Sequence, residues 1–173
     1  MEIFAETERL ILREILDEDE EALFELDSDP EVHRYVGNKP VINREQIQLV
    51  IGFIRQQYED NGIGRWAVIE KKTNNFVGWA GLKLFKENIN NHENFYELGY
   101  RFMQKHWGKG FATEASKAIV DYGFNVLKTD KIYAMTDVNN LASKKVLQKT
   151  GLKFIETFDF DGEPTDWFEI NKK

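Results

Sequence analysis

The sequence predicts a single α+β domain whose sheet is largely antiparallel. Three observations lead to this fold class: after a first short strand the apolar residues follow a helical period as far as Gly62, then a strand-like period from Gly64 to Gln104, and then an alternation of helix and strand. The chain has 173 residues, of which 42% are hydrophobic and 13% aromatic, which is enough for one well-formed core. No repeat or linker interrupts it, so residues 1–173 are expected to form one domain.

The first third of the chain combines one strand with three helical segments. The strand is expected at Leu10–Ile15, and a helix over Asp17–Asp27 can be capped by its first residue. Pro30–Tyr35 fits a short helical turn, because proline is favoured at the first helical position. Asn43 caps a longer helix that ends near Gly62. The apolar residues of this helix form one stripe: Ile47, Val50, Ile51, Ile54 and Tyr58.

The rest of the chain alternates strands and helices. Two strands joined by the turn Lys72–Asn75 form an expected hairpin, and a polar loop leads into the next strand. Gly151 marks the end of the last helix, because glycine tolerates the left-handed conformation at that position. The expected elements are, in order, strands Trp66–Glu70, Phe76–Leu82 and Tyr96–Gln104, helix Thr113–Leu127, strand Ile132–Asp137, helix Asn140–Thr150, and a closing hairpin of Lys153–Phe160 and Trp167–Ile170.

Charge, apolar runs and cysteine content exclude several classes of protein. The formal net charge of −7 and the pI near 5.1 argue against nonspecific binding to nucleic acid, which needs a basic surface. No apolar run approaches the ~20 residues of a membrane helix and the N-terminus lacks a signal-peptide pattern, so a cytoplasmic location is the default expectation. With no cysteine there is no disulfide, thiolate metal site or cysteine nucleophile. The three histidines lack the spacing of metal ligands, so no metal is expected.

A glycine-rich loop between a predicted strand and a predicted helix is the most informative motif, and it reads Trp107-Gly108-Lys109-Gly110-Phe111-Ala112-Thr113. Glycines let the main chain approach a ligand closely, and the N–H groups of the following helix attract anions, so a phosphate or pyrophosphate is the expected guest. A plain turn is the structural alternative. The rival motifs do not match: Thr113 replaces the third glycine of a dinucleotide fingerprint, and Gly108-Lys109-Gly110 lacks the spacing of a Walker loop.

Three groups of residues are spread along nearly the whole chain: Thr7–Arg13 with Asp29–Val32, Glu97–Tyr100 with Trp107–Ala115, and Asn140–Leu147 with Gly151-Leu152. Together, and in this order, they resemble the N-acetyltransferases of the GNAT superfamily, and within it the RimJ/RimL-like branch of ribosomal-protein N-terminal acetyltransferases. The resemblance implies a GNAT-like α+β fold: a mixed, mostly antiparallel sheet with flanking helices and one splayed pair of parallel strands, here Tyr96–Gln104 and Ile132–Asp137.

The resemblance also implies acetyl-CoA as co-substrate, bound where the two parallel strands splay apart. Phe102 and Met103 would give main-chain hydrogen bonds to the pantetheine arm. Asn140 matches a residue whose side chain faces that arm, and a helix N-cap is its alternative role. The remaining cofactor-binding residues are expected in the loop and at the start of the helix, where amides would hold the pyrophosphate: Trp107, Gly108, Lys109, Gly110, Ala112 and Thr113.

Because the chain has no cysteine, direct attack by an amine in a ternary complex is the expected route. Glu97 is the candidate general base, and an exposed strand residue or ion-pair partner is its alternative role. A main-chain N–H of a bulged strand, near Leu98 or Gly99, is expected to stabilise the oxyanion. Many relatives of this family carry a tyrosine as general acid where this chain has Leu147. The departing thiolate of CoA would then be protonated by Ser143, one turn away, or by an ordered water, or no acid would be needed.

The acceptor is expected to be an amine. A protein or peptide N-terminal α-amine comes first, and a polyamine or small amine, including an antibiotic, comes second. A non-catalytic acyl-CoA-binding domain and a mononucleotide-binding protein are the alternatives from other classes. Monomer and homodimer are both compatible with the sequence. Four aromatic residues either line an acceptor pocket or belong to the core: Tyr35, Trp66, Trp79 and Phe85.

Overall fold

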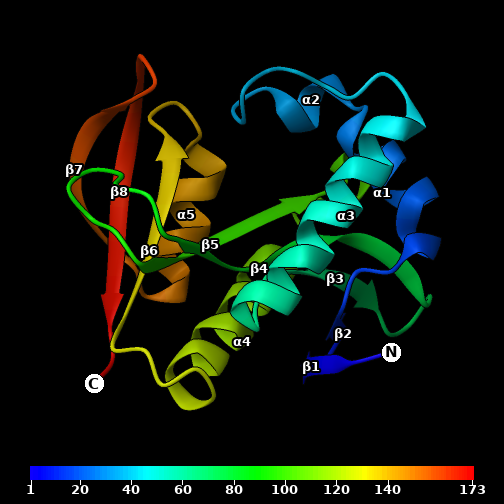
Figure 1. The fold of residues 1–173 in the computed structure, drawn as a ribbon, viewed down its shortest axis with the longest axis horizontal. Coiled ribbons are helices and arrows are strands. Elements are labelled where there is room, and N and C mark those ends of the chain that lie inside the picture. The colour runs from blue at the N-terminus through cyan, green and yellow to red at the C-terminus, as the bar shows by residue number, and fades with distance from the viewer.

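Eight strands form one mixed sheet in the computed structural model, which describes all residues from 1 to 173 (Figure 1). The strand order is β1-β2-β3-β4-β5-β6-β8-β7, and every neighbouring pair is antiparallel except β5 and β6. The strands are β1 (Ile3–Glu6), β2 (Leu10–Arg13), β3 (Arg65–Glu70), β4 (Asn75–Phe85), β5 (Phe95–Phe102), β6 (Lys131–Asp137), β7 (Lys153–Phe160) and β8 (Glu163–Asn171). The helices are α1 (Glu20–Asp27), α2 (Pro30–His33), α3 (Arg44–Asn61), α4 (Phe111–Asn125) and α5 (Leu141–Thr150).

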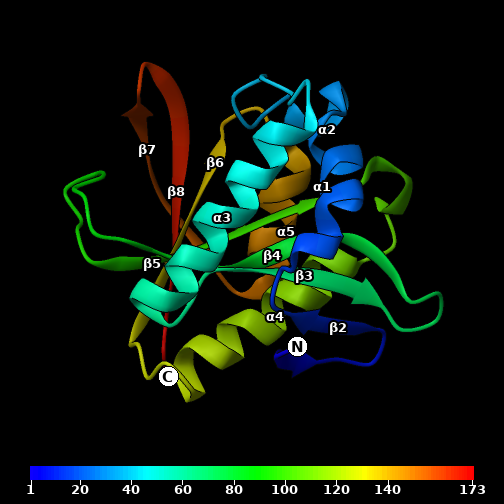
Figure 2. The ribbon, with the colours of Figure 1, turned by 45° about the vertical axis from the view of Figure 1, so that its right-hand side comes forward.

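Helices cover both faces of the sheet, each face over its own apolar core. Side chains alternate between faces along a strand, so in β3 Trp66 and Val68 pack toward α4, whereas Ala67 and Ile69 pack toward α1, α2 and α3. Figure 2 shows α3 crossing in front of the central strands. No helix combines the length and the apolar character that a membrane span requires.

The parallel strands β5 and β6 form a fork. Their ladder has a single paired position, Glu97 opposite Tyr133, beyond which the two strands diverge (Figure 1). On its other side β5 pairs with β4 in unbroken register, so β5 has no bulge, and the bulged strand expected near Leu98 and Gly99 is wrong. The opening arises instead because β6 pairs with β8 along its whole length and leaves β5.

Most of the predicted elements are confirmed, together with the local signals that predicted them. At the start of α3 the Asn43 side chain accepts a hydrogen bond from the Gln46 N–H at 3.0 Å. Gly62 and Gly151 end α3 and α5 with φ angles of 69° and 105°, in the left-handed region that glycine tolerates. The two glycines therefore end α3 a few residues before β3 and α5 a few residues before β7.

The main differences from the prediction are one missed strand and the starts of two helices. Strand β1 was not predicted, because four residues of mixed polarity give little periodic signal. Asp17 does not cap α1; a 3₁₀ turn precedes the helix, and the buried carboxylate there is Asp19, which pairs with Arg13 at 2.8 Å. Helix α4 begins at Phe111, two residues earlier than expected, so Gly110 lies directly at its start.

The four aromatic residues considered for an acceptor pocket do not share one surface. Trp66 is fully buried against α4, and Trp79 lies on the opposite face of the sheet. Phe85 belongs to a third apolar cluster that includes Trp167 of β8. Tyr35 follows α2, with the Arg34 guanidinium over its ring. Of the two alternatives for these residues, membership of the core is therefore the correct one for Trp66, Trp79 and Phe85.

Candidate active site

The glycine-rich loop leads directly into α4 and leaves its main-chain donors free. Gly108 and Gly110 have φ angles of 76° and 81°, which only glycine adopts readily. None of the N–H groups from Gly108 to Thr113 donates a hydrogen bond within the protein. Consecutive free donors at the positive end of a helix dipole form a site for an anion.

Arg9 and Glu114 hold this loop in place. The Arg9 guanidinium donates to the main-chain oxygen of Lys109 at 2.8 Å and to the Glu114 carboxylate at 2.7 Å. Glu114 also accepts from the Thr7 hydroxyl at 2.6 Å. Burial alone would raise the pKa of Glu114, but the hydrogen bonds from Thr7 and Arg9 outweigh it and hold that pKa below its ordinary value. The structure thus joins the opening segment of the chain to a loop that lies 100 residues further on.

The main-chain N–H groups along β5 point alternately toward β4 and toward the fork. The N–H of Met103 donates to a carbonyl of β4 at 3.0 Å. Every second residue of an antiparallel ladder faces the same neighbour, so Gly99 also directs its N–H to β4. Leu98, Tyr100 and Phe102 alternate with these residues and direct their N–H groups to the fork. Met103 therefore has no free N–H for a pantetheine arm, which corrects the expectation for that residue, whereas Phe102 has one.

Side chains around the loop are partly committed to the protein itself. The Trp107 indole donates to the carbonyl of Phe102 at 2.8 Å, although the residue is 48% exposed. Burial first, and then Lys109 and Lys105, hold the pKa of His106 below its ordinary value, so this imidazole is neutral at pH 7. Lys109 has no carboxylate partner and stays available to an anion on the loop.

The start of α5 reaches β5 through Tyr100 and Ser143. The two hydroxyl oxygens lie 2.8 Å apart, and Tyr100 also donates to the main-chain oxygen of Ser143 at 3.1 Å. Burial raises the pKa of Tyr100, which keeps it protonated. Asn140 caps α5 by accepting from the Ser143 N–H at 3.1 Å, and its amide NH₂ makes no hydrogen bond. Leu147 is buried in the core and offers no proton, so Tyr100 is the hydroxyl that sequence reasoning missed.

Glu97 lies at the apex of the fork, on the face covered by α1, α2 and α3. It is 8% exposed and makes no hydrogen bond. Burial raises the pKa of its carboxyl, against the opposing effect of Arg65 and then Lys83. A buried carboxyl with a raised pKa beside an open fork has the properties of a general base.

A charged cluster beside this carboxyl was not predicted. Arg65 and Arg101 both lie over the Trp79 ring, with guanidinium carbons 4.2 and 5.2 Å from its centroid. Arg101 pairs with Asp27 of α1 at 2.9 Å, and Asp27 lies 3.6 Å from His33 of α2. Burial, and next the charge of Arg101, lower the pKa of His33 and keep it neutral. Strand alternation could have placed Arg101 on this face, but no sequence signal points to its partner on α1.

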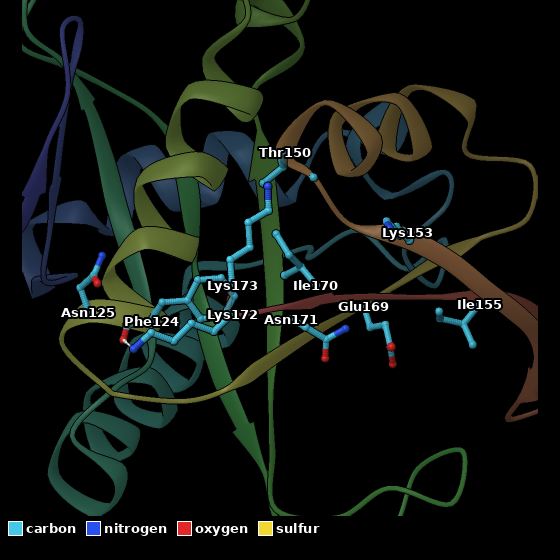
Figure 3. A pocket seen from close by; sticks show the side chains of 11 residues that line it. Phe124, Asn125, Thr150, Lys153, Ile155, Glu169, Ile170, Asn171, Lys172 and Lys173 are labelled. Carbon is cyan, nitrogen blue, oxygen red and sulfur yellow. Dashed lines mark hydrogen bonds between the residues drawn. The ribbon is translucent and has the colours of Figure 1, made fainter.

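Two surface pockets lie outside the open end of the fork, although Tyr133 at its apex lines one of them. One, of about 790 Å³, is formed by the C-terminal ends of α4 and α5 and the end of β8, at the opposite end of α4 from the glycine loop (Figure 3). Another, of about 500 Å³, adjoins the loop that precedes β5. Neither contains a predicted site residue. No three histidine, aspartate or glutamate side chains come together in a way that would hold a metal ion.

Comparison with known proteins identifies the family. Residues 9–153 match the model of an acetyltransferase (GNAT) domain. The uncharacterized N-acetyltransferase YoaA of Bacillus subtilis (strain 168) is 37% identical over 149 residues, which cover 86% of this chain and 81% of that protein. An acetyltransferase (GNAT family) from Bacillus anthracis is 27% identical, with a TM-score of 0.79 over 96% of both chains. The ribosomal L7/L12 alpha-N-protein acetyltransferase RimL, solved with coenzyme A, shares the fold at 14% identity, with a TM-score of 0.83 over 98% of both chains. The chain therefore belongs to the GNAT family of acetyltransferases, and it is an N-acetyltransferase.

Proposed function

We propose that this N-acetyltransferase transfers the acetyl group of acetyl-CoA to a primary amine by direct attack in a ternary complex. The observation that carries the proposal is the run of free N–H groups at Gly108–Thr113, beside a strand fork whose apex holds the buried Glu97. A pyrophosphate needs several donors at one point, and the attack of an amine on a thioester needs a base within reach of the amine.

The residues of the loop and the fork fit coenzyme A. We assign the pantetheine arm to the fork, with the N–H of Phe102 and the free amide of Asn140 as donors. Lys109 adds a positive charge beside the loop, and Trp107 flanks it. The pyrophosphate is assigned to the amides of the loop and the helix start: Gly108, Lys109, Gly110, Ala112 and Thr113.

Acetyl-CoA supplies the thioester carbon that the amine attacks. Glu97 takes the proton of the attacking amine, directly or through water. The main-chain N–H of Tyr100, on the fork side of β5 beyond the Glu97–Tyr133 pair, stabilises the negative charge on the carbonyl oxygen. Ser143, together with the Tyr100 hydroxyl, donates a proton to the departing thiolate. Thiol pKa values lie near ~8.5, so this last proton transfer lowers the barrier without being essential.

An N-terminal α-amine of a protein or peptide is the acceptor that fits this site best. Converting an α-amine to its neutral form at pH 7 costs about 1 kcal/mol, whereas a lysine-like amine costs roughly 4–5 kcal/mol. A single buried carboxyl such as Glu97 suits the smaller task. A polyamine or a small amine is the second candidate.

Ligand-induced thermal shift and thiol release with a panel of amines test the proposed function. We expect acetyl-CoA to raise the melting temperature and the protein to release CoA only when an amine is present. Binding of acetyl-CoA without release to any amine would indicate a non-catalytic acyl-CoA-binding domain. Stabilisation by ATP but not by acetyl-CoA would indicate a mononucleotide site.

Removing the Arg9 side chain is expected to loosen the glycine-rich loop and weaken acetyl-CoA binding without unfolding the protein. Arg9→Ala deletes the contacts to Lys109 and Glu114, and because the side chain is 43% exposed we expect a loss of only about 1 kcal/mol in unfolding free energy. The KM for acetyl-CoA should rise roughly tenfold, equivalent to about 1.4 kcal/mol. The matched control is Arg55→Ala, which removes an arginine of equal exposure that pairs with Glu14 far from the loop. An equal rise in KM for both variants would contradict the anchoring role.

Tyr100 and Ser143 are expected to act as one unit in proton donation. Tyr100→Phe and Ser143→Ala should each lower kcat by about 10- to 100-fold with little change in the KM for acetyl-CoA. The double variant should be no slower than the slower single variant, because residues of one proton path are not additive. Steady-state kinetics at several pH values measure this, and multiplicative effects of the two substitutions would show that the hydroxyls act separately.

A further inference from the structure

On the sheet face that carries Glu97, two glycines lie side by side on neighbouring strands. Arg65 pairs with Gly81, and Gly81 pairs with Gly99, so the three residues stand side by side on β3, β4 and β5. Directly paired residues point to the same face, and the Arg65 side chain therefore extends over two glycines toward the fork. A Cβ atom on Gly99 would lie 3.0 Å from the Glu97 carboxylate and 3.5 Å from Nη2 of Arg65. The base and the guanidinium thus flank one point above Gly99.

Neither of these two groups has a partner in the protein. Glu97 makes no hydrogen bond, and Arg65 makes no side-chain hydrogen bond and no ion pair. The Nε of Arg65 is buried without an acceptor. Stacking on Trp79 holds the guanidinium in place and uses none of its N–H donors. Arg101, on the same ring, differs because Asp27 accepts its hydrogen bond.

The charges around this point do not suit a polycation. Arg65, Arg101 and Lys83 are positive, and only Asp27 and Glu97 are negative. His33, which faces the cluster from α2, is neutral. A polyamine would bring further positive charges to a site that has no excess of carboxylates. An acceptor that carries an oxygen close to its amine would instead satisfy the free guanidinium.

We propose, resting on the acetyltransferase function proposed above, that Arg65 binds the oxygen of an α-amino acyl group while Glu97 receives its amine. In such a group only two carbon atoms separate the amine nitrogen from the carbonyl or carboxylate oxygen. The amine and the oxygen can therefore each reach one of the two groups that flank Gly99, a carboxylate and a guanidinium that do not pair with each other. Arg65 is then a specificity-determining residue that selects amino acids or peptide N-termini over polyamines.

Two amines that differ only in the acyl oxygen group provide the first test. Alaninamide and isopropylamine share the carbon that carries the amine, and the second has a methyl group in place of the amide. At equal concentrations of unprotonated amine, we expect kcat/KM to be at least about tenfold higher for alaninamide, as for a hydrogen bond to a charged group. Alanine and an alanyl peptide then distinguish a carboxylate from a peptide carbonyl as the preferred oxygen. Preference for isopropylamine or spermidine overturns the inference.

Replacing Arg65 provides the second test. Arg65→Met should bring the two amines to within about threefold of each other, with acetyl-CoA binding unchanged. Arg65→Lys keeps the charge but lacks the forked donors, and it serves if the methionine variant does not fold. Arg44→Met is the control, because Arg44 also stacks on an aromatic ring, Phe24, but already pairs with Glu21.

The outcomes separate the inference from the function on which it rests. An equal loss toward all amines in the Arg65 variants would assign this residue a structural role and overturn the inference alone. Failure of the wild-type protein to acetylate any amine of the panel would contradict the proposed function, and the inference with it.

Discussion

Glu97→Gln is expected to lower kcat/KM by about 10²–10⁴-fold, the usual contribution of a positioned general base. Glutamine keeps the size of the side chain and its place at the apex of the fork, but it cannot accept a proton from the amine. Affinity for acetyl-CoA, measured by calorimetry, should not change, because the loop to which we assign the pyrophosphate lies beyond the end of β5. Glu70→Gln is the matched control: it changes a glutamate of β3 that hydrogen-bonds Thr73 at the hairpin turn.

The pH dependence of kcat/KM tests the role of Glu97 as the general base independently. A general base works only when ionised, so wild-type kcat/KM should fall as the pH decreases through the raised pKa of Glu97. This acidic limb should lie above the ordinary value of 4.5 and should be absent from the residual activity of Glu97→Gln. A variant that keeps the limb, or that loses less than about tenfold in kcat/KM, would show that another group is the base.

The same shift predicts a change in stability. The pKa of Glu97 is higher in the folded than in the unfolded protein, so the folded state binds more protons, and the stability contributed by this carboxyl falls as the pH rises from 4.5 through the raised pKa. Glutamine does not titrate, and Glu97→Gln should therefore gain stability relative to wild type over this range. Denaturant unfolding at several pH values measures the difference. A stable but inactive variant would also show that lost activity is not unfolding.

Local signals predicted most of the fold because they act over a few residues. The cap at Asn43 and the glycines at the ends of α3 and α5 are examples, since each depends only on its own hydrogen bond or φ angle. The loop at Gly108–Gly110 was predicted for the same reason. Strand β1 was not, because a four-residue edge strand is stabilised mainly by its neighbours, as in the stacking of Phe4 on Trp66 at 4.6 Å.

Contacts between distant segments could not be predicted in this way. The sequence presents Arg9 and Lys109 in separate motifs, and only the fold shows that one holds the other. Arg65 and Arg101 become visible as a pair only when strand register places both over Trp79. The missing acid at Leu147 was noticed, but its neighbour Tyr100 lies on another element. Residue types therefore indicated the chemistry, whereas strand register decided which residues share the site.

Gly108→Ala is expected to raise the Kd for acetyl-CoA by about 10- to 100-fold, which corresponds to about 1.4–2.8 kcal/mol. Gly108 has a φ angle of 76°, and a Cβ added there meets no protein atom within 4 Å. The substitution therefore causes no clash inside the protein, and its backbone strain costs about 1–2 kcal/mol of unfolding free energy. The methyl group instead projects from the loop where the main chain must approach a pyrophosphate, and relief of the strained φ would turn the donors away from it.

Gly62→Ala separates these two effects. Gly62 ends α3 with a φ angle of 69° and also has no protein atom within 4 Å of an added Cβ, so it carries the same backbone strain away from the loop. Both variants should unfold at similarly reduced denaturant concentrations, but only Gly108→Ala should lose affinity for acetyl-CoA in a calorimetric titration. Equal affinities in the two variants would mean that the amides at Gly108–Thr113 do not hold the cofactor, and the pyrophosphate would then have to be assigned to another part of the surface.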